Sequence, residues 1–549
     1  MENKTNLSSN SKSPTKNTLV DGLSVRSILI GLLGGAFISA SSIYVALKMG
    51  ALPWPIVFAS ILSFTLLKLM GNTNLSEVNV AHTTMSAGAM VAGGIAFTIP
   101  GIWILNPETS ISWIQVVVAT LIGVAIGLVC SYLLRPRFID EQDLPYPMGQ
   151  ASAQTLIASD AGGKDLSVLG GSLGFAAIYT FLRDKLALIP PVFFGNASIL
   201  GVPLAVYASP MMMSVGYLLG GLAALGLIVG ALVGFLGIAS LAVSSGVFTA
   251  DHATFVRSSL GIGLMLGSGL GVIITSAIRL VKSSSQSSKN SKGIALDKKG
   301  AAIILIIALI AVASATACLH INLLASIVLI ALCAVAVIMA LQSVGETSID
   351  PMEVFAVIMV MILRVIWDIQ VPEAFFLTCV VAVAAGLAGD TMSDFKAGRI
   401  IGTTPKSQFI GEIFGALFGA AIAIGVLYLL VKGYGTNIFG ADKEFVAVQA
   451  SVVASMIGGS LHLKAMILGL VIGVALHLLK VPAITLGLGV YLPLHLTLAA
   501  LVGALIKVVL NKFAPKFEER YGVIVASGLL GGEAIVGVII ALVMMLGAI

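Results

Sequence analysis

Several ionisable side chains lie inside long apolar stretches of this chain, where they could bind protons or a polar ligand. An ionisable group in a membrane segment costs several kcal/mol unless it is paired or reached by water. A carboxylate that is alternately buried and hydrated can therefore take up and release a proton. The alternative is that each carboxylate caps a helix or pairs with Arg364 or Lys396. The candidates that accompany glycine-rich or interrupted sequence are Glu77, His82, Glu346, Asp350, Glu412, His462 and Glu533.

Signatures of enzymes are missing from the sequence. It contains no HExxH helix for zinc, no GxSxG elbow and no GxxxxGK[ST] loop for ATP. Residues 386–390 look by eye like the motif of an intramembrane aspartyl protease. Their glycine spacing differs, however, and we expect no partner aspartate for Asp390 on a neighbouring helix. The four cysteines have no CxxC spacing, which argues against a disulfide framework or a zinc site. We therefore predict no enzyme activity and no cofactor.

The elements that must position these side chains are membrane helices. Of the 549 residues, 58% are hydrophobic and only 10% are charged, against about 25% charged residues in soluble domains. Such a chain cannot cover its surface with polar atoms, so a soluble protein is excluded and the lipid bilayer is the expected solvent. The net charge of +5 comes from basic residues in loops. This pattern favours the positive-inside rule over nucleic-acid or lipid-signal binding, because the basic run at 279–299 has no interleaved aromatic residues.

Fifteen apolar stretches are long enough to cross a bilayer, which takes about 20 residues per helix. Basic loops place the N-terminal tail, residues 135–137, 183–185 and the linker in the cytoplasm only if residues 147–159 also cross. We therefore predict an all-α polytopic membrane protein with about 16 transmembrane helices in two pseudo-symmetric halves, and with both termini cytoplasmic. One basic loop, at 512–520, would lie outside against this rule. The fifteen stretches are 26–48, 54–71, 83–103, 112–134, 166–182, 211–244, 254–281, 299–318, 321–341, 353–370, 373–389, 408–431, 463–479, 483–510 and 523–547.

The composition of successive segments predicts a tail, two transmembrane halves and a linker between them. Residues 1–22 are polar and lack an apolar core, which predicts a disordered cytoplasmic tail and not a cleaved signal peptide. Residues 23–281 form the predicted first transmembrane half, residues 282–298 a basic, serine-rich cytoplasmic linker, and residues 299–549 the second half. Whether the protein forms a homo-oligomer stays open at this point.

Several stretches are poor candidates for straight helices. Residues 190–210 contain four prolines, 342–353 read QSVGETSIDPME, and 458–463 read GGSLHL. Polar, broken backbone at membrane depth is tolerated only beside protein or a water-filled cavity, and matched breaks in two halves point to the binding site of a transporter. Residues 76–88 and 345–353 each fall in about the third crossing of their half. We interpret them as a pair of broken segments.

Read in order, these segments resemble the oligopeptide transporter (OPT) family, in its prokaryotic branch, which is related to the yellow-stripe-like metal-chelate transporters. The resemblance runs from about residue 22 to 549. Its motifs begin with Glu77-x-Asn79-x-x-His82-Thr83-x-x-Ser86-Ala87-Gly88, Leu144-Pro145-Tyr146-Pro147-x-Gly149 and Gly345-x-Thr347-x-Ile349-x-Pro351-Met352. They continue with Gly389-Asp390-x-x-x-Asp394-x-Lys396-x-Gly398, Thr404-Pro405-x-x-Gln408, Gly458-Gly459-Ser460, Tyr491-Leu492-Pro493-Leu494 and Gly531-Gly532-Glu533-Ala534-x-x-Gly537.

Several positions differ from the family pattern. His82 stands where the family is expected to have Gln, and Glu346 and Asp350 stand where Gln and Asn are expected. Met148 replaces a usual Glu, and His462 replaces a frequent Pro. These changes add ionisable groups to the expected site. They favour a more charged ligand or a different proton-coupling residue.

The resemblance implies a secondary transporter of the cell (plasma) membrane that takes up small oligopeptides, thiol peptides or metal chelates together with protons, without ATP. Alternating access would move one helix bundle against the other. A channel or facilitator for a small polar solute is the main alternative, and an intramembrane protease is a second one. No nucleic acid and no resident metal is assigned. The residues expected to contact substrate or protons are Glu77, Asn79, His82, Thr83, Glu346, Thr347, Asp350, Asp390, Asp394, His462, Tyr491 and Glu533.

Overall fold

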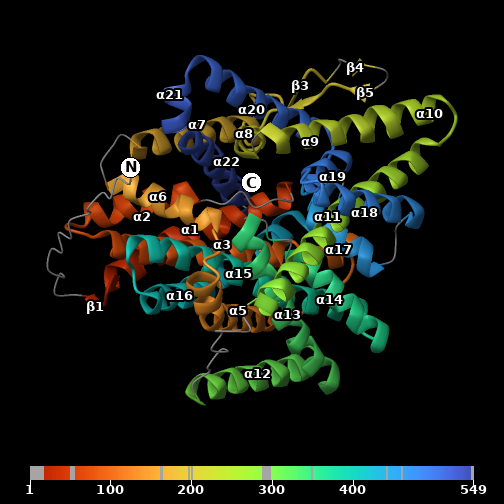
Figure 1. Ribbon diagram of the computed structural model, residues 1–549. Coiled ribbons are helices and arrows are strands. Elements are labelled where there is room, and N and C mark those ends of the chain that lie inside the picture. Colours follow the sequence, from red (N-terminus) through yellow and green to blue (C-terminus); the bar gives the residue numbers. More distant parts are fainter. Residues whose placement is uncertain are drawn as a thin grey trace.

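The computed structural model is built almost entirely of helices (Figure 1). It describes residues 18–49, 56–160, 165–195, 198–199, 202–219, 221–286, 298–347, 350, 352–440, 443–458 and 462–545. The elements up to residue 286 are β1 (Thr18–Val20), β2 (Leu23–Ser24), α1 (Val25–Met49), α2 (Ile56–Leu69), α3 (Leu75–Ala96), α4 (Gly101–Leu105), α5 (Trp113–Arg135), η1 (Pro136–Glu141), α6 (Pro147–Asp160), α7 (Asp165–Asp184), β3 (Val192–Phe193), β4 (Ser198–Ile199), β5 (Val202–Pro203), β6 (Val206–Tyr207), α8 (Pro210–Leu219), α9 (Gly221–Ala231), η2 (Leu232–Leu241), α10 (Ala242–Ser244) and α11 (Ala250–Gln286).

The second part of the chain has no strand among its described residues. Its elements are α12 (Lys298–Cys318), α13 (Leu323–Thr347), α14 (Met352–Ile366), α15 (Val371–Ile401), α16 (Pro405–Tyr434), α17 (Val448–Gly458), α18 (Leu463–Leu478), α19 (Ala483–Tyr491), α20 (Leu494–Phe513), α21 (Pro515–Phe517), η4 (Glu518–Gly522) and α22 (Val523–Met545). The described strands of the first part form three short antiparallel pairs, β1 with β2, β3 with β6 and β4 with β5.

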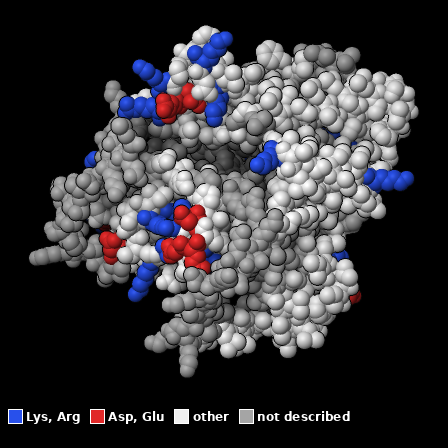
Figure 2. Space-filling model, in the orientation of Figure 1, with Lys and Arg blue, Asp and Glu red and all other residues white. Residues whose placement is uncertain are grey.

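Helix length and apolar composition confirm the prediction of an all-α polytopic membrane protein. Eight helical spans within the described residues are long and apolar enough to cross a bilayer. Charged side chains on the face in Figure 2 gather in two patches, the upper one where Figure 1 has α21, and uncharged surface covers wide areas of the rest. The figure of about 16 crossings stays a prediction. The eight spans are Val25–Lys48, Leu75–Leu105, Trp113–Glu141, Ala224–Ser244, Leu323–Gly345, Val371–Ile401, Pro405–Tyr434 and Leu494–Phe513.

Two helices, α3 and α15, form the centre of the molecule. Every residue of α3 from Glu77 to Ala96 is buried, and so is every residue of α15 from Ala374 to Gly398. Both helices are rich in alanine and glycine, so neighbouring helices can approach their backbones closely. The helix α3 packs against α1, α15 and α16, while α15 also packs against α5, α6, α13 and α14. Polar groups on these two helices are therefore shielded from lipid by other parts of the chain.

Several of the most extensive helix pairs join the first part of the chain to the second, although α1 with α3 lies within the first part. They include α11 with α18, α5 with α15, α7 with α22, and α3 with α16. The boundaries at 281 and 299 and the pseudo-symmetry of two halves stay predictions from sequence. Most of the linker and the first 17 residues of the N-terminal tail lie outside the described residues.

The interruptions differ in part from the expected ones. Asp350 between α13 and α14 and His462 between α17 and α18 are not helical, and neither are the described residues of 190–209, as predicted. The interpretation of 76–88 as a broken segment was wrong, because α3 is continuous through it. Asn74 caps α3 by accepting a hydrogen bond from the Glu77 backbone N–H at 2.8 Å. The polar side chains of α3 from Glu77 onward are buried against other helices. The helix α17 was not predicted from the sequence.

Candidate functional site

Four carboxylates lie together at the centre of the helix bundle. Asp390 and Asp394 are one helical turn apart on α15, Glu412 is on α16, and Asp350 precedes α14. We call these four residues the carboxylate cluster. Asp390 and Asp394 are each 3% exposed, and Glu412 is completely buried. Glu412 has both aspartates of α15 as electrostatic neighbours, and Asp390 has Asp350 as a further one. The fold thus concentrates negative charge from three segments that are distant in sequence.

His82 is the ionisable base beside this cluster. Its Nδ1 atom lies 3.7 Å from Oδ1 of Asp394, and its Nε2 atom lies 3.2 Å from Oγ of Ser152 on α6. Ser86, one turn further along α3, donates a hydrogen bond of 2.6 Å to the other carboxylate oxygen of Asp394. His82 and Ser86 are four residues apart and lie on the same face of α3, so each contacts a different carboxylate oxygen of Asp394.

Amide and hydroxyl groups extend the polar region toward the start of α16. Gln408 donates a hydrogen bond of 2.6 Å to the backbone carbonyl of Asp394 and a longer one of 3.4 Å to Oγ1 of Thr83. Asn79 donates a hydrogen bond of 3.1 Å to Oγ1 of Thr403. Asn79, His82 and Thr83, which the sequence motif singled out, thus all face the α15–α16 side of α3.

Much of the carboxylate cluster lacks hydrogen-bond donors. Both carboxylate oxygens of Glu412, both of Asp350 and Oδ2 of Asp390 have no hydrogen-bond partner among the described residues. A buried ionised carboxylate without a donor or a cation is very unfavourable. The cluster therefore requires bound protons, water or a cationic ligand.

The nearest basic residues of α15 are engaged elsewhere. Lys396 donates to Oδ1 of Asp143 at 2.9 Å, and Arg399 donates to the same atom at 3.1 Å and to the carbonyl of Ile139. These contacts, together with the 3.9 Å approach of Arg399 to Asp140, form what we call the loop ion pairs. The hydrogen bond from Lys396, followed by the charges of Lys396 and Arg399, lowers the pKa of Asp143 below its ordinary value.

Arg364, the other cation expected to pair with a carboxylate, donates to the carbonyl of Ile457 at 2.6 Å. Neither Arg364 nor Lys396 has an ion pair with the carboxylate cluster within the part of the chain that the structure describes. The alternative that these two cations neutralise the cluster thus finds no support in their contacts.

Glycines set the distances between the helices that carry these groups. A Cβ atom on Gly415 of α16 would lie 2.1 Å from the backbone carbonyl oxygen of Thr84 on α3. A Cβ atom on Gly419 would lie 2.2 Å from Cα of Gly88, and one on Gly149 of α6 would lie 2.1 Å from the carbonyl oxygen of Ser393. The glycine repeats therefore hold α3, α6, α15 and α16 in direct backbone contact around the carboxylate cluster.

Glu77 lies outside the cluster, at the first turn of α3. Its carboxylate accepts hydrogen bonds from Ser24 at 2.5 Å, from Nε and Nη2 of Arg26 at 3.1 and 2.6 Å, and from Thr73 at 2.9 Å. These contacts join the start of α3 to the start of α1. All described hydrogen bonds of the Glu77 side chain thus stabilise the packing of the start of α3 against the start of α1.

Glu533 has a similar environment on α22. It accepts hydrogen bonds from Nη2 of Arg183 at 3.0 Å, from Ser209 at 2.9 Å and from the backbone N–H of Met211 at 2.8 Å. The last contact places a carboxylate at the N-terminus of α8, where the helix dipole favours negative charge. Its described contacts hold α7, α8 and α22 together.

The remaining predicted residues are also apart from the cluster. His462 caps α18, with Nδ1 accepting a hydrogen bond of 3.2 Å from the Ala465 backbone N–H, and its ring lies 5.4 Å from that of His252. The backbone carbonyl of Tyr491 accepts a hydrogen bond of 3.1 Å from Arg257. Glu346 and Thr347 belong to the last turn of α13, and their side chains lie outside the described residues.

The described residues contain no group of three or more His, Cys, Asp or Glu side chains arranged to hold a metal ion. The four cysteines are all free thiols.

The comparison with known proteins identifies the family. The family profile described as OPT oligopeptide transporter protein matches residues 22–544, nearly the entire chain. The chain belongs to the OPT family. It is thus a multi-pass membrane transporter and not an enzyme, which confirms the predicted class.

Curated relatives agree with membership of the OPT family. A Haemophilus influenzae protein named "Putative oligopeptide transporter" is 23% identical over 597 aligned residues, covering 91% of this chain and 92% of the relative. Two Oryza sativa subsp. japonica proteins named "Probable metal-nicotianamine transporter", YSL13 and YSL14, are 25% and 27% identical and match 27% of this chain and 23% of their own length.

The site of this OPT-family chain adds several residues to those expected. Asp390 has two carboxylate neighbours on other segments, Glu412 on α16 and Asp350 before α14, and neither of them is an aspartate on a neighbouring helix. Ser86 and Gln408 were part of the sequence motifs without an assigned role, and Ser152 had no signal at all. Glu412 is one of the ionisable residues in an apolar stretch, and only the fold brings it close to Asp394.

Proposed function

We propose that this protein is a proton-coupled secondary transporter that takes up small oligopeptides or peptide-like metal chelates by alternating access. The observation that carries the proposal is the buried carboxylate cluster, whose one described ion-pair contact is with His82 and which no Lys or Arg neutralises through a described ion pair. The names of the relatives support the two substrate classes. We place the protein in the cell membrane with both termini in the cytoplasm, as the loop charges favour.

The proton chemistry follows from electrostatics. Two carboxylates one helical turn apart in a water-poor site repel each other strongly when both are ionised, so such groups bind protons as a set. Glu412 and Asp350 add further negative charge and offer oxygens without hydrogen-bond partners among the described residues. If α15 and α16 separate from α3 or α6, water reaches the cluster and stabilises its ionised form, so protons leave on the side that opens.

The same groups can receive a substrate. A peptide amine or a chelated cation supplies the positive charge that the carboxylate cluster lacks, while Asn79 and Thr83 offer polar contacts on α3. Substrate binding and protonation then compete for the same charge, which links their movement. Glu346 and Thr347 are expected to complete this site from the end of α13.

Four residues that were expected to contact substrate or protons have structural contacts instead. Glu77, Glu533, His462 and Tyr491 have structural contacts at helix ends, so we assign proton binding to the carboxylate cluster and His82 ahead of them. Their participation in transport stays a prediction that substitution tests.

The test is transport in proteoliposomes with an imposed pH gradient. Thermal-shift screening against di- to pentapeptides, glutathione and iron chelates first selects a substrate. Uptake should then run uphill when the outside is acidified and should carry protons, which an internal pH dye reports. Uptake that never exceeds the external concentration would favour the alternative of a channel or facilitator.

Substitutions in the carboxylate cluster test whether these residues couple substrate uptake to protons. Asp394→Asn and Glu412→Gln should each abolish uphill uptake and also weaken substrate binding, because the same carboxylates hold the proton and the substrate. Asp368→Asn, which changes an exposed carboxylate beyond the end of α14, is the matched control. Wild-type coupling in both cluster variants would refute the proposal.

A further inference from the structure

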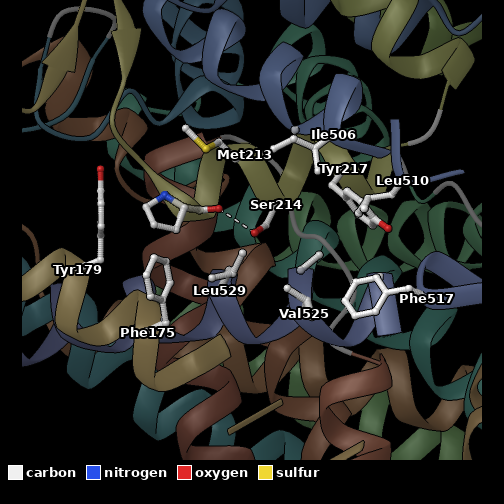
Figure 3. A pocket seen from close by; sticks show the side chains of 14 residues that line it. Phe175, Tyr179, Met213, Ser214, Tyr217, Ile506, Leu510, Phe517, Val525 and Leu529 are labelled. Atoms are coloured by element: carbon white, nitrogen blue, oxygen red, sulfur yellow. Dashed lines mark hydrogen bonds between the residues drawn. The ribbon is translucent and has the colours of Figure 1, made fainter. Parts of the chain in front are cut away.

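An apolar crevice lies between α7, α8, α20 and α22 (Figure 3), well apart in sequence from the carboxylate cluster. Its volume is about 300 Å³. Side chains from all four helices and from α21 converge on it, among them Phe175, Met213, Ile506, Phe517 and Leu529. It is therefore a pre-formed space large enough for part of a ligand, at a place to which transport assigns no role.

The lining of this crevice is almost completely apolar. Three lining residues carry a hydroxyl group, and two of these groups are already used. Ser214 donates to the Pro210 carbonyl at 2.7 Å and Tyr217 donates to Oε1 of Glu518 at 3.1 Å (Figure 3 shows the first of these bonds), while the third hydroxyl belongs to Tyr179 on α7. A peptide or a metal chelate would lose its hydrogen bonds to water here without replacement. The crevice thus fits a hydrocarbon chain and disfavours a transported substrate.

Glycines allow the helices around the crevice to approach each other closely. A Cβ atom on Gly503 of α20 would lie 1.7 Å from the carbonyl oxygen of Met213 on α8, and one on Gly522 would lie 1.9 Å from the hydroxyl oxygen of Tyr217. The crevice runs along α20 from Leu510 to Gly503, a rise of about 10 Å at 1.5 Å per residue. This length suits a segment of an acyl chain.

Basic residues occur in the second half of α20 and in the connection that follows it, close in sequence to lining residues of the crevice. Lys507 lies over the ring of Tyr217, with Nζ 5.3 Å from the ring centroid. Lys512 closes the last turn of α20, and Lys516 and Arg520 belong to the α20–α22 connection, which contributes Phe517 and Gly522 to the lining. In Figure 2 basic side chains surround acidic ones at the place of α21. The acidic residues there, Glu518 and Glu519, leave the connection with an excess of positive charge.

We propose that this crevice binds one acyl chain of an anionic phospholipid, whose phosphate is held by Lys507, Lys516 and Arg520. Long apolar lining next to a cluster of cations at the end of a membrane helix is complementary to such a lipid and to no other part of the bilayer. The predicted topology places the 512–520 loop outside, against the positive-inside rule, and a lipid site would explain its basic residues there. The inference does not rest on the proposed function.

The test is native mass spectrometry of the full-length protein in detergent, with phosphatidylglycerol and phosphatidylcholine that have identical acyl chains. We expect phosphatidylglycerol to be retained preferentially. The triple variant Lys507→Gln, Lys516→Gln, Arg520→Gln should lower the affinity for phosphatidylglycerol by at least about tenfold and abolish the preference. Lys464→Gln, at an exposed position at the start of α18, is the control that should bind like the wild type.

A second variant tests the crevice itself. Ala526→Phe places a ring into the space and should weaken binding of both lipids, and thermal melting establishes that this variant is folded. If it is not, Leu529→Phe serves the same purpose with a smaller increase in volume. Equal retention of the two lipids by the wild type, or unchanged phosphatidylglycerol binding in the charge variant or in a folded filling variant, would overturn the proposal.

Discussion

The contact between α3 and α16 should be intolerant of a single methyl group at Gly415. A Cβ atom there would lie 2.1 Å from the carbonyl oxygen, 2.9 Å from the carbonyl carbon and 3.1 Å from Cα of Thr84. All three are backbone atoms, so no side-chain rotation can relieve the overlap. The helices must separate by about 1 Å to restore ordinary contact distances, and overpacking of this kind costs about 1–3 kcal/mol.

The chain provides a matched control on the same helix. Gly425 of α16 has no atom within 4 Å of the position of its Cβ. Gly425→Ala and Gly415→Ala share the same gain in helix propensity, about 1 kcal/mol in water. The difference between the two variants therefore isolates the packing cost, and we expect Gly415→Ala to be less stable by about 1–3 kcal/mol.

The assay is unfolding of both variants in the same detergent, followed by uptake in proteoliposomes. Separation of α16 from α3 also moves Glu412 and Gln408 away from His82 and Thr83, so Gly415→Ala should lose uptake even at temperatures where it is folded. Equal stability and equal uptake of the two variants would refute the argument that direct backbone contact positions the carboxylate cluster.

Two further outcomes follow from other contacts. Glu533→Gln should lower the free energy of unfolding by about 1–3 kcal/mol, because Arg183 loses one charged partner while it keeps Asp184; reduced uptake at unchanged stability would instead make Glu533 a transport residue. For the loop ion pairs, the pKa of Asp143 is lowered in the folded protein. Their stabilisation is therefore complete above the ordinary aspartate pKa of about 3.9 and is lost as the pH falls through the lower folded value. The difference in melting temperature between the wild type and Asp143→Asn should stay constant from pH 8 to about 5 and shrink only below about pH 4, and a change near neutral pH would contradict this assignment.

Most helices could be predicted from apolar length alone, because the bilayer fixes how many residues a crossing requires. The stretches 112–134 and 299–318 match α5 and α12 to within one residue at each end. The helix α17 was missed because its polar and small residues, from Gln449 to Ser455, weaken the apolar signal. Residues 76–88 were read as broken for the same reason, since hydropathy does not reveal that polar side chains face other helices.

The site was predictable one residue at a time but not as an assembly. Asp390, Asp394 and His82 stood out as ionisable residues in apolar or motif sequence, and the fold brings them together. The sequence could not separate them from Glu77 and Glu533, because the cations that satisfy those two, Arg26 and Arg183, come from distant helix ends. Long-range pairing of this kind has no signal in local spacing.

The interleaving of early and late helices has a consequence for biogenesis. The polar face of α3 is covered by α15 and α16, which the ribosome completes about 300 residues later. Until then Asn79, His82 and Thr83 have to be shielded by lipid-excluding factors of the insertion machinery or held at the membrane surface. Because helices of the two parts pack against each other, each fragment of a chain cut between residues 287 and 297 should need the other to fold. Co-synthesis of both fragments should therefore restore the folded protein.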